Sequence, residues 1–227
     1  MSSAVEVIAG HPVPASMLES LVLAPRVRDY SPHLLDEAMA SGDVVLTGRS
    51  AIGTRDGWVQ LWPAGLVLNE PTDGELSERA AAMYEQMLSG GAWTLAELAM
   101  STVMPADIDA LWELVWSGRV TPNSFQALRE LSTAGALKRP PAPKPGRRSL
   151  VAGLRTPRLV GPSGRWTAVQ STVPPEQAAV VAASLLVGRH GVLTRGAIAA
   201  DPLFPNFSSA YAVLSAMEST GAVRRGW

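Results

Sequence analysis

A unit of helix, glycine and strand residues occurs three times in this sequence. Its clearest copy is Asp107–Thr121, where apolar residues recur every three or four positions before Gly118 and strand-forming residues follow. The same order occurs in Leu34–Val45 and Val213–Arg224. A helix that ends at a glycine and returns as a strand forms the second half of a winged helix, the recognition helix and the start of the wing. Unequal spacing between the copies favours separate modules over a solenoid. Three unrelated helices with glycine caps are the alternative.

We therefore predict a mainly α fold with small β wings (α+β), built as a tandem array of about three winged-helix modules. The first module is expected at 1–63, with a truncated first helix, and a connector at 64–76 follows it. The second module is expected at 77–172 and contains a long basic, proline-rich wing insertion at 138–163. The third module is expected at 173–227 and is truncated before its wing.

Local patterns add three expectations. In the second module, Gly164–Gln170 should pair with Arg119–Thr121, since that strand otherwise has an unpaired edge. In the third module, the helix Glu176–Val187 should be followed by a turn at 189–191 and a strand at Val192–Thr194. Near the N-terminus, 15–23 should be helical and share one apolar face made of Met17, Leu18, Leu21 and Val22.

The composition excludes several classes of protein. The chain has 227 residues, 47% of them hydrophobic and 17% charged, and a net charge of −1, as globular proteins have. It has no cysteine, which excludes disulfides, thiolate metal sites and cysteine nucleophiles. The three histidines are far apart in sequence. The N-terminus lacks a secretory signal, and the longest apolar run, Ala178–Val187, is too short to span a membrane. We expect a cytoplasmic protein with no membrane partner.

No catalytic motif is present. The sequence contains no Gly-Lys pair, so it has no P-loop for ATP. The stretch 161–164 resembles a GxSxG motif only superficially and is interpreted as a turn. The carboxylate pairs Asp36/Glu37 and Asp107/Asp109 are interpreted as complements of helix dipoles. We expect no catalytic residue, cofactor site or metal site in this chain.

Basic residues are unevenly distributed. No acidic residue lies between Glu130 and Glu176, whereas basic residues and prolines are frequent there. Arginine binds phosphate through two parallel hydrogen bonds, and each neutralised phosphate releases counterions. We therefore predict that this basic tract binds a nucleic-acid backbone; a solvated basic linker is the alternative. The predicted nucleic-acid-binding residues are Lys138, Arg139, Lys144, Arg147, Arg148, Arg155, Arg158 and Arg165 of the tract, with Arg49, Arg55, Arg195, Arg224 and Arg225 as helpers.

The presumed recognition helices are acidic or nearly neutral. The acidic residues of the first two are Asp36, Glu37, Asp107, Asp109 and Glu113. Phosphates would repel such helices from a DNA groove, so we expect them to pack against protein. Trp112 and Trp116 fit this expectation as core or module–module contacts.

Four stretches resemble one known family. Ser20–Gly48, Ala110–Leu131, Gly164–Val169 and Arg189–Trp227 are similar, in this order, to the C-terminal region of bacterial Lhr, the large helicase-related proteins. The resemblance implies a winged-helix array that, in the family, follows an ATP-dependent motor and precedes a β-barrel similar to AlkZ-type DNA glycosylases. The motor motifs are absent from this sequence, and it ends before the barrel is expected.

The resemblance implies a nucleic-acid-binding and assembly scaffold, a C-terminal fragment of an Lhr-type ATP-dependent helicase that acts in DNA repair. The expected partners are DNA or an RNA:DNA hybrid, bound without sequence preference, the remaining helicase domains, and a second copy of the chain. ATP and Mg would belong to the motor core, so no enzymatic activity is expected from this chain alone. The alternatives are part of an AlkZ-like winged-helix DNA glycosylase without its barrel, and a winged-helix transcription regulator.

Overall fold

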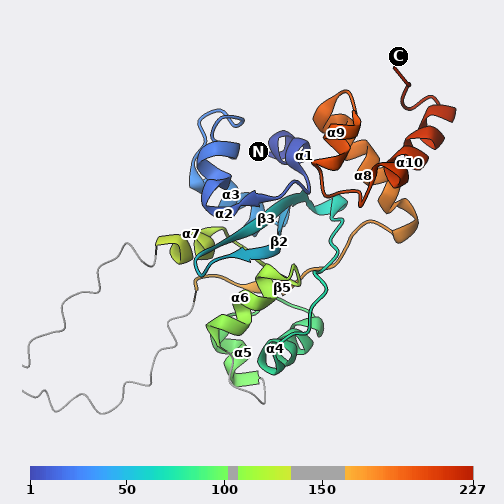
Figure 1. The fold of residues 1–227 in the computed structure, drawn as a ribbon. Coiled ribbons are helices and arrows are strands. Elements are labelled where there is room, and N and C mark those ends of the chain that lie inside the picture. Colours follow the sequence, from blue (N-terminus) through green and yellow to red (C-terminus); the bar gives the residue numbers. More distant parts are fainter. Residues whose placement is uncertain (102–106, 134–161, 227) are drawn as a thin grey trace, which may run out of the picture.

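The computed structural model describes residues 1–101, 107–133 and 162–226 (Figure 1). The helices are α1 (Ser2–Ile8), α2 (Ala15–Met17), the π-helix η1 (Leu18–Leu23), α3 (Pro32–Ala40), the 3-10 helix η2 (Ala64–Leu66), α4 (Glu78–Leu88), α5 (Leu95–Ser101), α6 (Ile108–Trp116), α7 (Gln126–Thr133), α8 (Pro175–His190), α9 (Arg195–Ala199) and α10 (Phe207–Ser219). The strands are β1 (Val13–Pro14), β2 (Val44–Ile52), β3 (Asp56–Pro63), β4 (Val120–Pro122) and β5 (Trp166–Ala168). Helices with small antiparallel sheets confirm the predicted α+β class.

The first module contains a three-stranded sheet in the order β1-β3-β2; Figure 1 shows β2 and β3 side by side. β2 and β3 form the wing hairpin, in which Val44 lies opposite Pro63 and Ile52 opposite Asp56. Gly53 lies in the turn with φ +63°, a conformation that glycine adopts without steric cost. The wing expected from the sequence is therefore present and complete.

The segment after β1 differs from its predicted form. Leu18–Leu23 forms a π-helix, in which Ala24 N–H donates to the Glu19 carbonyl five residues earlier, at 2.9 Å. Of the predicted face, Leu18 is buried and Val22 packs against the core, but Met17 is 47% exposed and Leu21 is 61% exposed. Leu23, five residues after Leu18, is buried as well. The expected face was therefore wrong for Met17 and Leu21, because it assumed α-helical spacing.

In the second module, β4 and β5 pair antiparallel, with Val120 opposite Ala168 and Pro122 opposite Trp166. This pairing confirms that Gly164–Gln170 returns to the strand after α6. Trp166 also exchanges two backbone hydrogen bonds with Trp93. The proposed insertion at 138–163 falls almost entirely outside the described residues.

The first two modules share one hydrophobic core, which extends from Val5 to Trp166, and we call them the two-module unit. Its centre is α6, which packs on the wing. A Cβ atom at Gly48 would lie 2.0 Å from the Val115 carbonyl oxygen, and one at Gly57 would lie 2.5 Å from the Trp116 ring. These two glycines therefore permit the close approach of α6 to the hairpin.

Two tryptophans of α6 make the contacts expected of them. The Trp112 and Trp116 rings stack with centroids 5.4 Å apart. Trp112 also meets the edge of buried Trp166 at 5.7 Å. Because Trp116 packs on Gly57 of the wing, the pair joins the two modules, as predicted.

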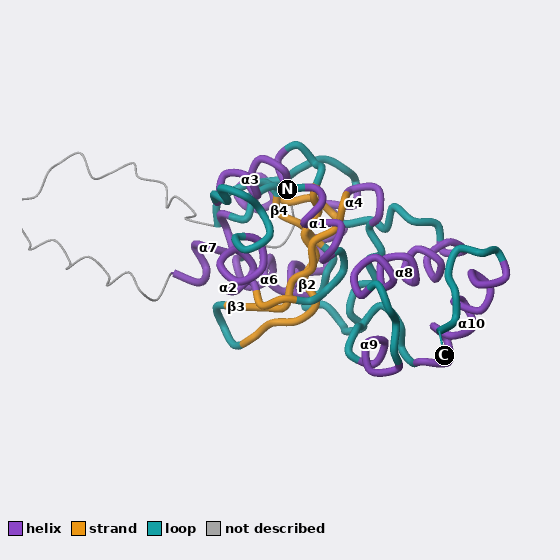
Figure 2. The backbone as a smooth tube through the Cα atoms, turned by 90° about the horizontal axis from the view of Figure 1, so that it is seen from above, coloured by secondary structure: helices purple, strands orange, loops and turns teal. Residues whose placement is uncertain are grey.

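The third module consists of α8, α9 and α10, which lie together to one side of the two-module unit (Figure 2). It has its own small core of Ala182, Ala183, Leu186, Ile198, Phe204 and Ala210. A separate buried cluster of Ala9, Trp62, Val67 and Val169, with Leu185 and Leu203 against it, joins this module to the first. Of the helices in the ranges described, none combines the length and the hydropathy needed to cross a membrane.

The third module corrects two expectations. α8 continues through His190, so Arg189 and His190 are helical rather than part of a turn. Gly191, with φ +68°, ends the helix. The expected strand Val192–Thr194 is a loop, because Thr194 caps α9 by accepting the Ala197 N–H at 3.1 Å.

Candidate nucleic-acid interface

The predicted basic tract cannot be placed. Lys138, Arg139, Lys144, Arg147, Arg148, Arg155 and Arg158 lie outside the described residues. The remaining predicted residues are Arg165, Arg49, Arg55, Arg195, Arg224 and Arg225, and they occupy three separate regions of the structure.

Arg165 directly precedes β5 and is paired with protein groups. Its guanidinium donates to the Ala92 carbonyl at 2.6 Å and to the Glu97 carboxylate at 3.2 Å, although half of the side chain remains exposed. Glu97 also forms a capping box with Thr94. The hydrogen bonds from the Thr94 backbone and hydroxyl lower the pKa of the Glu97 carboxyl, and Arg165 lowers it to a smaller extent. Arg165 thus joins β5 to the start of α5.

Arg49 and Arg55 both lie on the wing of the first module. Arg49 occupies the register shift between Gly48 and Ser50, and its carbonyl accepts a hydrogen bond from the Thr72 hydroxyl at 3.0 Å. Arg55 is exposed in the loop between β2 and β3. They are close in sequence but separate from the other predicted residues.

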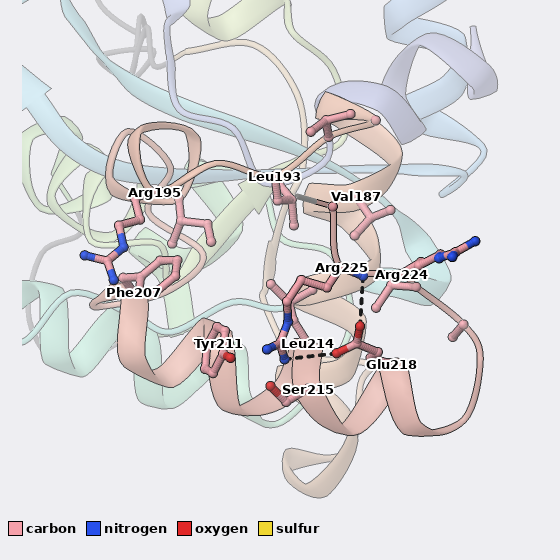
Figure 3. A pocket seen from close by; sticks show the side chains of 16 residues that line it. Val187, Leu193, Arg195, Phe207, Tyr211, Leu214, Ser215, Glu218, Arg224 and Arg225 are labelled. Atoms are coloured by element: carbon pink, nitrogen blue, oxygen red, sulfur yellow. Dashed lines mark hydrogen bonds and ion pairs between the residues drawn. The ribbon is translucent and has the colours of Figure 1, made fainter.

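Arg195, Arg224 and Arg225 line one depression of about 530 Å³, with Arg195 at one side and Arg224 and Arg225 at the other (Figure 3). We call this depression, between α8, α9 and α10, the hollow. The Arg195 guanidinium lies over the Phe207 ring at 4.7 Å, and that of Arg225 over the Tyr211 ring at 5.2 Å. Such cation–π contacts attract a guanidinium to the face of the ring.

Sequence reasoning missed the two rings. Phe207 and Tyr211 are four residues apart on α10, so they lie on one face of the helix, with centroids 5.7 Å apart. Spacing alone would have placed them side by side, but it could not show that arginines from two other segments lie over them.

One carboxylate contributes to the hollow. Glu218 accepts from the Arg225 backbone N–H at 2.9 Å and from its guanidinium at 3.0 Å. Within the described residues, Arg195 and Arg224 have no carboxylate at ion-pair distance. The hollow therefore carries more positive than negative charge.

Two acidic residues of the second presumed recognition helix, Asp107 and Glu113, bind protein groups. Asp107 caps α6 by accepting the Ala110 N–H at 2.6 Å and pairs with Arg79 at 2.7 Å. Glu113 accepts both the backbone N–H and the hydroxyl of Ser77 at 2.7 Å. The cap at Ala110 and the Arg79 contact outweigh partial burial and lower the pKa of the Asp107 carboxyl.

Asp36 has a different role from the one expected. It lies inside α3 rather than at its start, and it accepts hydrogen bonds from Ser124 Oγ at 2.8 Å and the Phe125 N–H at 2.9 Å, just before α7. A residue of the first module thus satisfies backbone groups at the start of a helix in the second. The dipole interpretation was wrong because this partner is 88 residues away in sequence.

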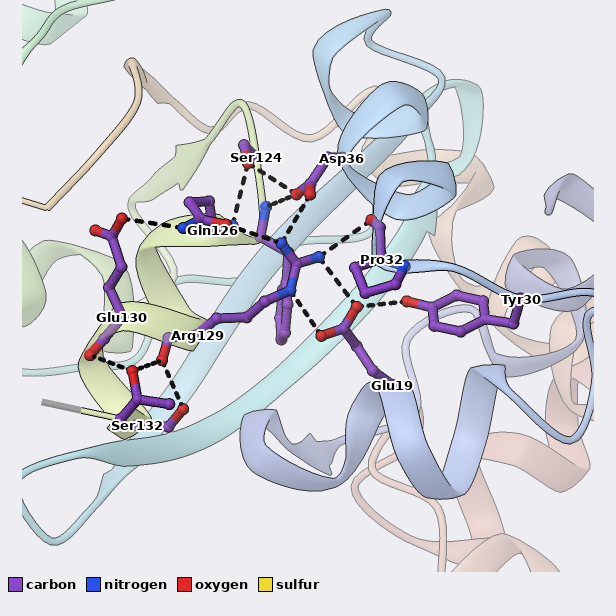
Figure 4. Close-up of polar contacts among 11 residues, drawn as sticks. Glu19, Tyr30, Pro32, Asp36, Ser124, Gln126, Arg129, Glu130 and Ser132 are labelled. Atoms are coloured by element: carbon purple, nitrogen blue, oxygen red, sulfur yellow. Dashed lines mark hydrogen bonds and ion pairs between the residues drawn. The ribbon is translucent and has the colours of Figure 1, made fainter. Parts of the chain in front are cut away.

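Arg129 of α7 connects the same two modules (Figure 4). Its guanidinium binds the Glu19 carboxylate through two hydrogen bonds, at 2.7 and 3.0 Å, and the Asp36 carboxylate at 2.7 Å. Tyr30 donates its hydroxyl to Glu19 at 2.6 Å, and burial together with this carboxylate raises the pKa of Tyr30. We call Arg129, Glu19, Asp36 and Tyr30 the Arg129 network. Nothing in the local sequence predicted it.

A second polar cluster joins the third module to the first. Arg189 of α8 pairs with the buried Asp201 carboxylate and donates to the carbonyls of Val7, at 3.1 Å, and Ala9 at the end of α1. Two histidine rings also approach the Asp201 carboxylate: His11 lies 3.7 Å from it, and His190 lies 3.9 Å from it. Within the described ranges, no group of His, Asp or Glu side chains could hold a metal ion. These contacts form the Asp201 network.

Comparison with known proteins gives consistent matches. Family models of the Large helicase-related protein, winged-helix domain, match residues 1–64, for the third such domain of Lhr, and residues 172–227, for the fourth. The chain is 38% identical to the Lhr helicase/probable uracil glycosylase of Mycolicibacterium smegmatis, in an alignment of 243 residues that covers 100% of this chain. It is 29% identical over 244 residues to the Lhr helicase/uracil glycosylase of Escherichia coli, with 98% of this chain covered. The chain spans 16% of the length of each relative.

Proposed function

Because this chain belongs to the large helicase-related (Lhr) family, as part of its C-terminal winged-helix region, we propose that it is a nucleic-acid-binding and assembly scaffold of an Lhr-type ATP-dependent helicase. The helicase and uracil glycosylase activities that the relatives' names give belong to those proteins; we propose neither for this chain alone. Its role is to hold nucleic acid and neighbouring domains in place during DNA repair.

The observation that carries the nucleic-acid role is the gathering of Arg195, Arg224 and Arg225 around the hollow. Other arginines of the described chain, such as Arg129 and Arg189, bind carboxylates between modules. At the hollow, Arg225 binds Glu218, but Arg195 and Arg224 are exposed and have no carboxylate at ion-pair distance within the described residues. Arginine in this setting binds phosphate, so we propose that the hollow and the basic tract Lys138–Arg165 both contact the nucleic-acid backbone.

The scaffold role is supported by the packing of α3 and α6. Their acidic side chains bind Ser124, Arg129, Arg79 and Ser77, and α6 lies against the wing. Neither helix presents a basic surface to a DNA groove. Binding of DNA or an RNA:DNA hybrid is therefore proposed to use backbone contacts and to be independent of sequence.

A salt titration tests this proposal. Arg195→Gln with Arg224→Gln should flatten the slope of log affinity against log salt by about one unit per lost phosphate contact, and so by up to about two. Neutralising Arg147, Arg148, Arg155 and Arg158 should flatten it by up to about four units. The matched control is Arg26→Gln with Arg28→Gln, which removes the same charge from two exposed arginines elsewhere.

The control pair should leave the slope close to that of the parent chain. If neither the hollow variant nor the tract variant changes the slope, the proposed surface does not bind nucleic acid. If the control flattens the slope as much as the hollow variant does, binding depends on net charge alone and the assignment of residues is wrong.

A further inference from the structure

The hollow combines an apolar interior with charged margins. Leu193, Ile198 and Leu214 line it, and Figure 3 shows Leu193 and Leu214 between the arginines. Val192 at its edge is 77% exposed and Tyr211 is 42% exposed. Apolar surface of this kind, gathered in a depression with a few polar groups, is typical of a ligand site.

The charged margin has a fixed geometry. The guanidinium carbon of Arg195 lies over the Phe207 ring, and that of Arg225 lies over the Tyr211 ring. Slightly over half of the Arg225 side chain is exposed, and Arg195 is exposed as well. Nucleobases stack both on aromatic rings and on the planes of guanidinium groups. The rings and the arginines therefore offer stacking surfaces beside groups that bind phosphate.

From this combination we infer that the hollow binds an unstacked nucleobase of a single-stranded nucleic acid, while Arg195 and Arg224 bind the flanking phosphates. This inference rests on the proposed function and specifies its substrate. A nucleotide matches both features of the site, because its base is flat with apolar faces and its phosphate is anionic. An apolar protein segment would cover the interior but leave the Arg195 and Arg224 charges without partners.

The inference also predicts a preference between forms of nucleic acid. In a duplex, each base is stacked and paired, so placing one in the hollow would require unpairing it. A single strand can present a base without that cost. The chain should therefore bind a single strand more tightly than a duplex with the same number of phosphates.

The test compares two strands of equal length and charge. One is a thymidine oligonucleotide and the other has the same phosphodiester backbone with abasic sites throughout. By fluorescence anisotropy at one salt concentration, the parent chain should bind the base-bearing strand at least about fivefold more tightly, as expected for stacking of one base. Tyr211→Leu should remove most of this difference, and Tyr211→Phe, which keeps the ring, should retain it.

Trp58→Leu is the matched control, because Trp58 is an aromatic residue of similar exposure, 39%, on the wing of the first module. It should keep the preference for the base-bearing strand. A circular dichroism melt of each variant separates loss of the stacking surface from unfolding of the third module. If Tyr211→Leu does not fold, Arg225→Gln, which removes the second stacking plane, should also reduce the preference.

Three outcomes would overturn the inference. Equal binding of the two strands by the parent chain, with both weakened in Arg195→Gln, would mean that the hollow contacts only the backbone; the proposed function would stand. A preference that persists in folded Tyr211→Leu would place the base elsewhere. Loss of the preference in the full-length protein would show that a protein segment covers the hollow. Absence of binding to either strand would instead contradict the proposed function itself.

Discussion

Arg129 shows how much of this molecule depends on single polar side chains between modules. It donates to Glu19 on η1, to Asp36 on α3 and to the Pro32 carbonyl at 3.2 Å, and it lies over the Phe125 ring (Figure 4). The Arg129, Glu19 and Asp36 side chains are each only about a fifth to a quarter exposed. Hydrogen bonds between charged groups with this little exposure are stronger than surface ion pairs.

Arg129→Met should therefore destabilise the two-module unit. The substitution keeps a long apolar side chain but leaves the Glu19 and Asp36 carboxylates without their cation. We expect the free energy of unfolding to fall by about 2–3 kcal/mol. Urea unfolding measures this loss as a lower midpoint concentration, with the dependence of the free energy of unfolding on urea concentration unchanged. Arg26→Met, at an exposed position, is the control and should change stability by less than about 0.5 kcal/mol. A similarly small effect of Arg129→Met would contradict the role of the network.

The same network makes stability depend on pH. Partial burial raises the pKa of the Asp36 carboxyl, but its bonds to Arg129, Ser124 and the Phe125 N–H outweigh burial and lower the pKa below its usual range. A carboxyl with a lowered pKa in the folded state stabilises the fold above its unfolded pKa of about 3.9, and this contribution is lost as the pH falls through the folded pKa. The parent chain should lose stability below about pH 4.

Asp36→Asn should be less stable than the parent at pH 7, and the difference should shrink as the pH falls below about 4, because the parent then loses the same charge. Thermal melts across this pH range measure the effect. Glu37→Gln, at the exposed neighbouring position, should follow the parental curve. Parallel curves for Asp36→Asn and the parent would show that Asp36 makes no titrating contribution to stability.

At the scale of elements, the contact between β2 and α6 requires glycine. The Cβ atom of Gly48→Ala would lie 2.0 Å from the Val115 carbonyl oxygen, and backbone cannot move aside as a flexible side chain can. We expect a loss of about 3 kcal/mol, at the upper end of overpacking effects. Gly65→Ala is the control, because no atom lies within 4 Å of its added Cβ, and it should be nearly neutral. Equal stability of the two variants would mean that α6 does not pack this closely on the wing.

Much of this element structure could be predicted because its signals are local. Asp107 before α6 and Gly118 after it, with φ +75°, mark the helix ends, and the pairing of β4 with β5 followed from an unpaired edge. The π-helix could not be predicted, because burial of Leu23 depends on the core rather than on spacing. The extension of α8 to Arg189 likewise depends on the Val7 and Ala9 carbonyls, which are 180 or more positions away.

The candidate site was predictable to a smaller extent. Composition identified Arg195, Arg224 and Arg225 as basic residues without showing that they surround one hollow. Their partners Phe207 and Tyr211 lie on a different segment from Arg195 and Arg225, so the cation–π contacts exist only after the third module has folded. The Arg129 network joins residues up to 110 positions apart and left no local pattern.

For the whole molecule, the sequence predicts that the chain does not hydrolyse ATP. A phosphate-binding loop needs glycines followed by a lysine that reaches the phosphates, and this sequence has no Gly-Lys pair. A phosphate-release assay of purified chain, with and without single-stranded DNA, should show no turnover above background. Turnover that increases with DNA in a preparation free of other ATPases would contradict this prediction.

The two cores suggest that the molecule does not unfold as one unit. The core of the two-module unit includes large side chains such as Leu111 and Trp166. The core of the third module includes three alanines among its six buried residues, so it buries less apolar surface. Between the cores lie the small cluster around Trp62 and the Asp201 network. We therefore expect the third module to open first.

Arg189→Met tests how strongly the Asp201 network couples the modules. Burial alone would raise the pKa of the Asp201 carboxyl, but His11, Arg189 and the Leu203 N–H outweigh burial and lower it, so Asp201 remains charged at pH 7 and needs its cation. The variant leaves this charge buried without arginine and removes the bonds to the Val7 and Ala9 carbonyls. We expect the third module to lose about 3 kcal/mol and to unfold in a separate, earlier transition.

Hydrogen exchange resolves the two transitions by region. In Arg189→Met, amides of α8 and α10 should exchange at least about tenfold faster, while those of β3 and α6 should keep their parental rates, because the two-module unit retains its own core. Arg195→Met is the control within the same module, because the Arg195 guanidinium lies over the Phe207 ring and forms no ion pair within the described residues. It should leave α8 protected. If Arg189→Met accelerates β3 and α6 as much as α8, the three modules form one cooperative unit and the Asp201 network is part of a single core. If it accelerates none of them, the apolar cluster around Trp62 alone holds the third module in place.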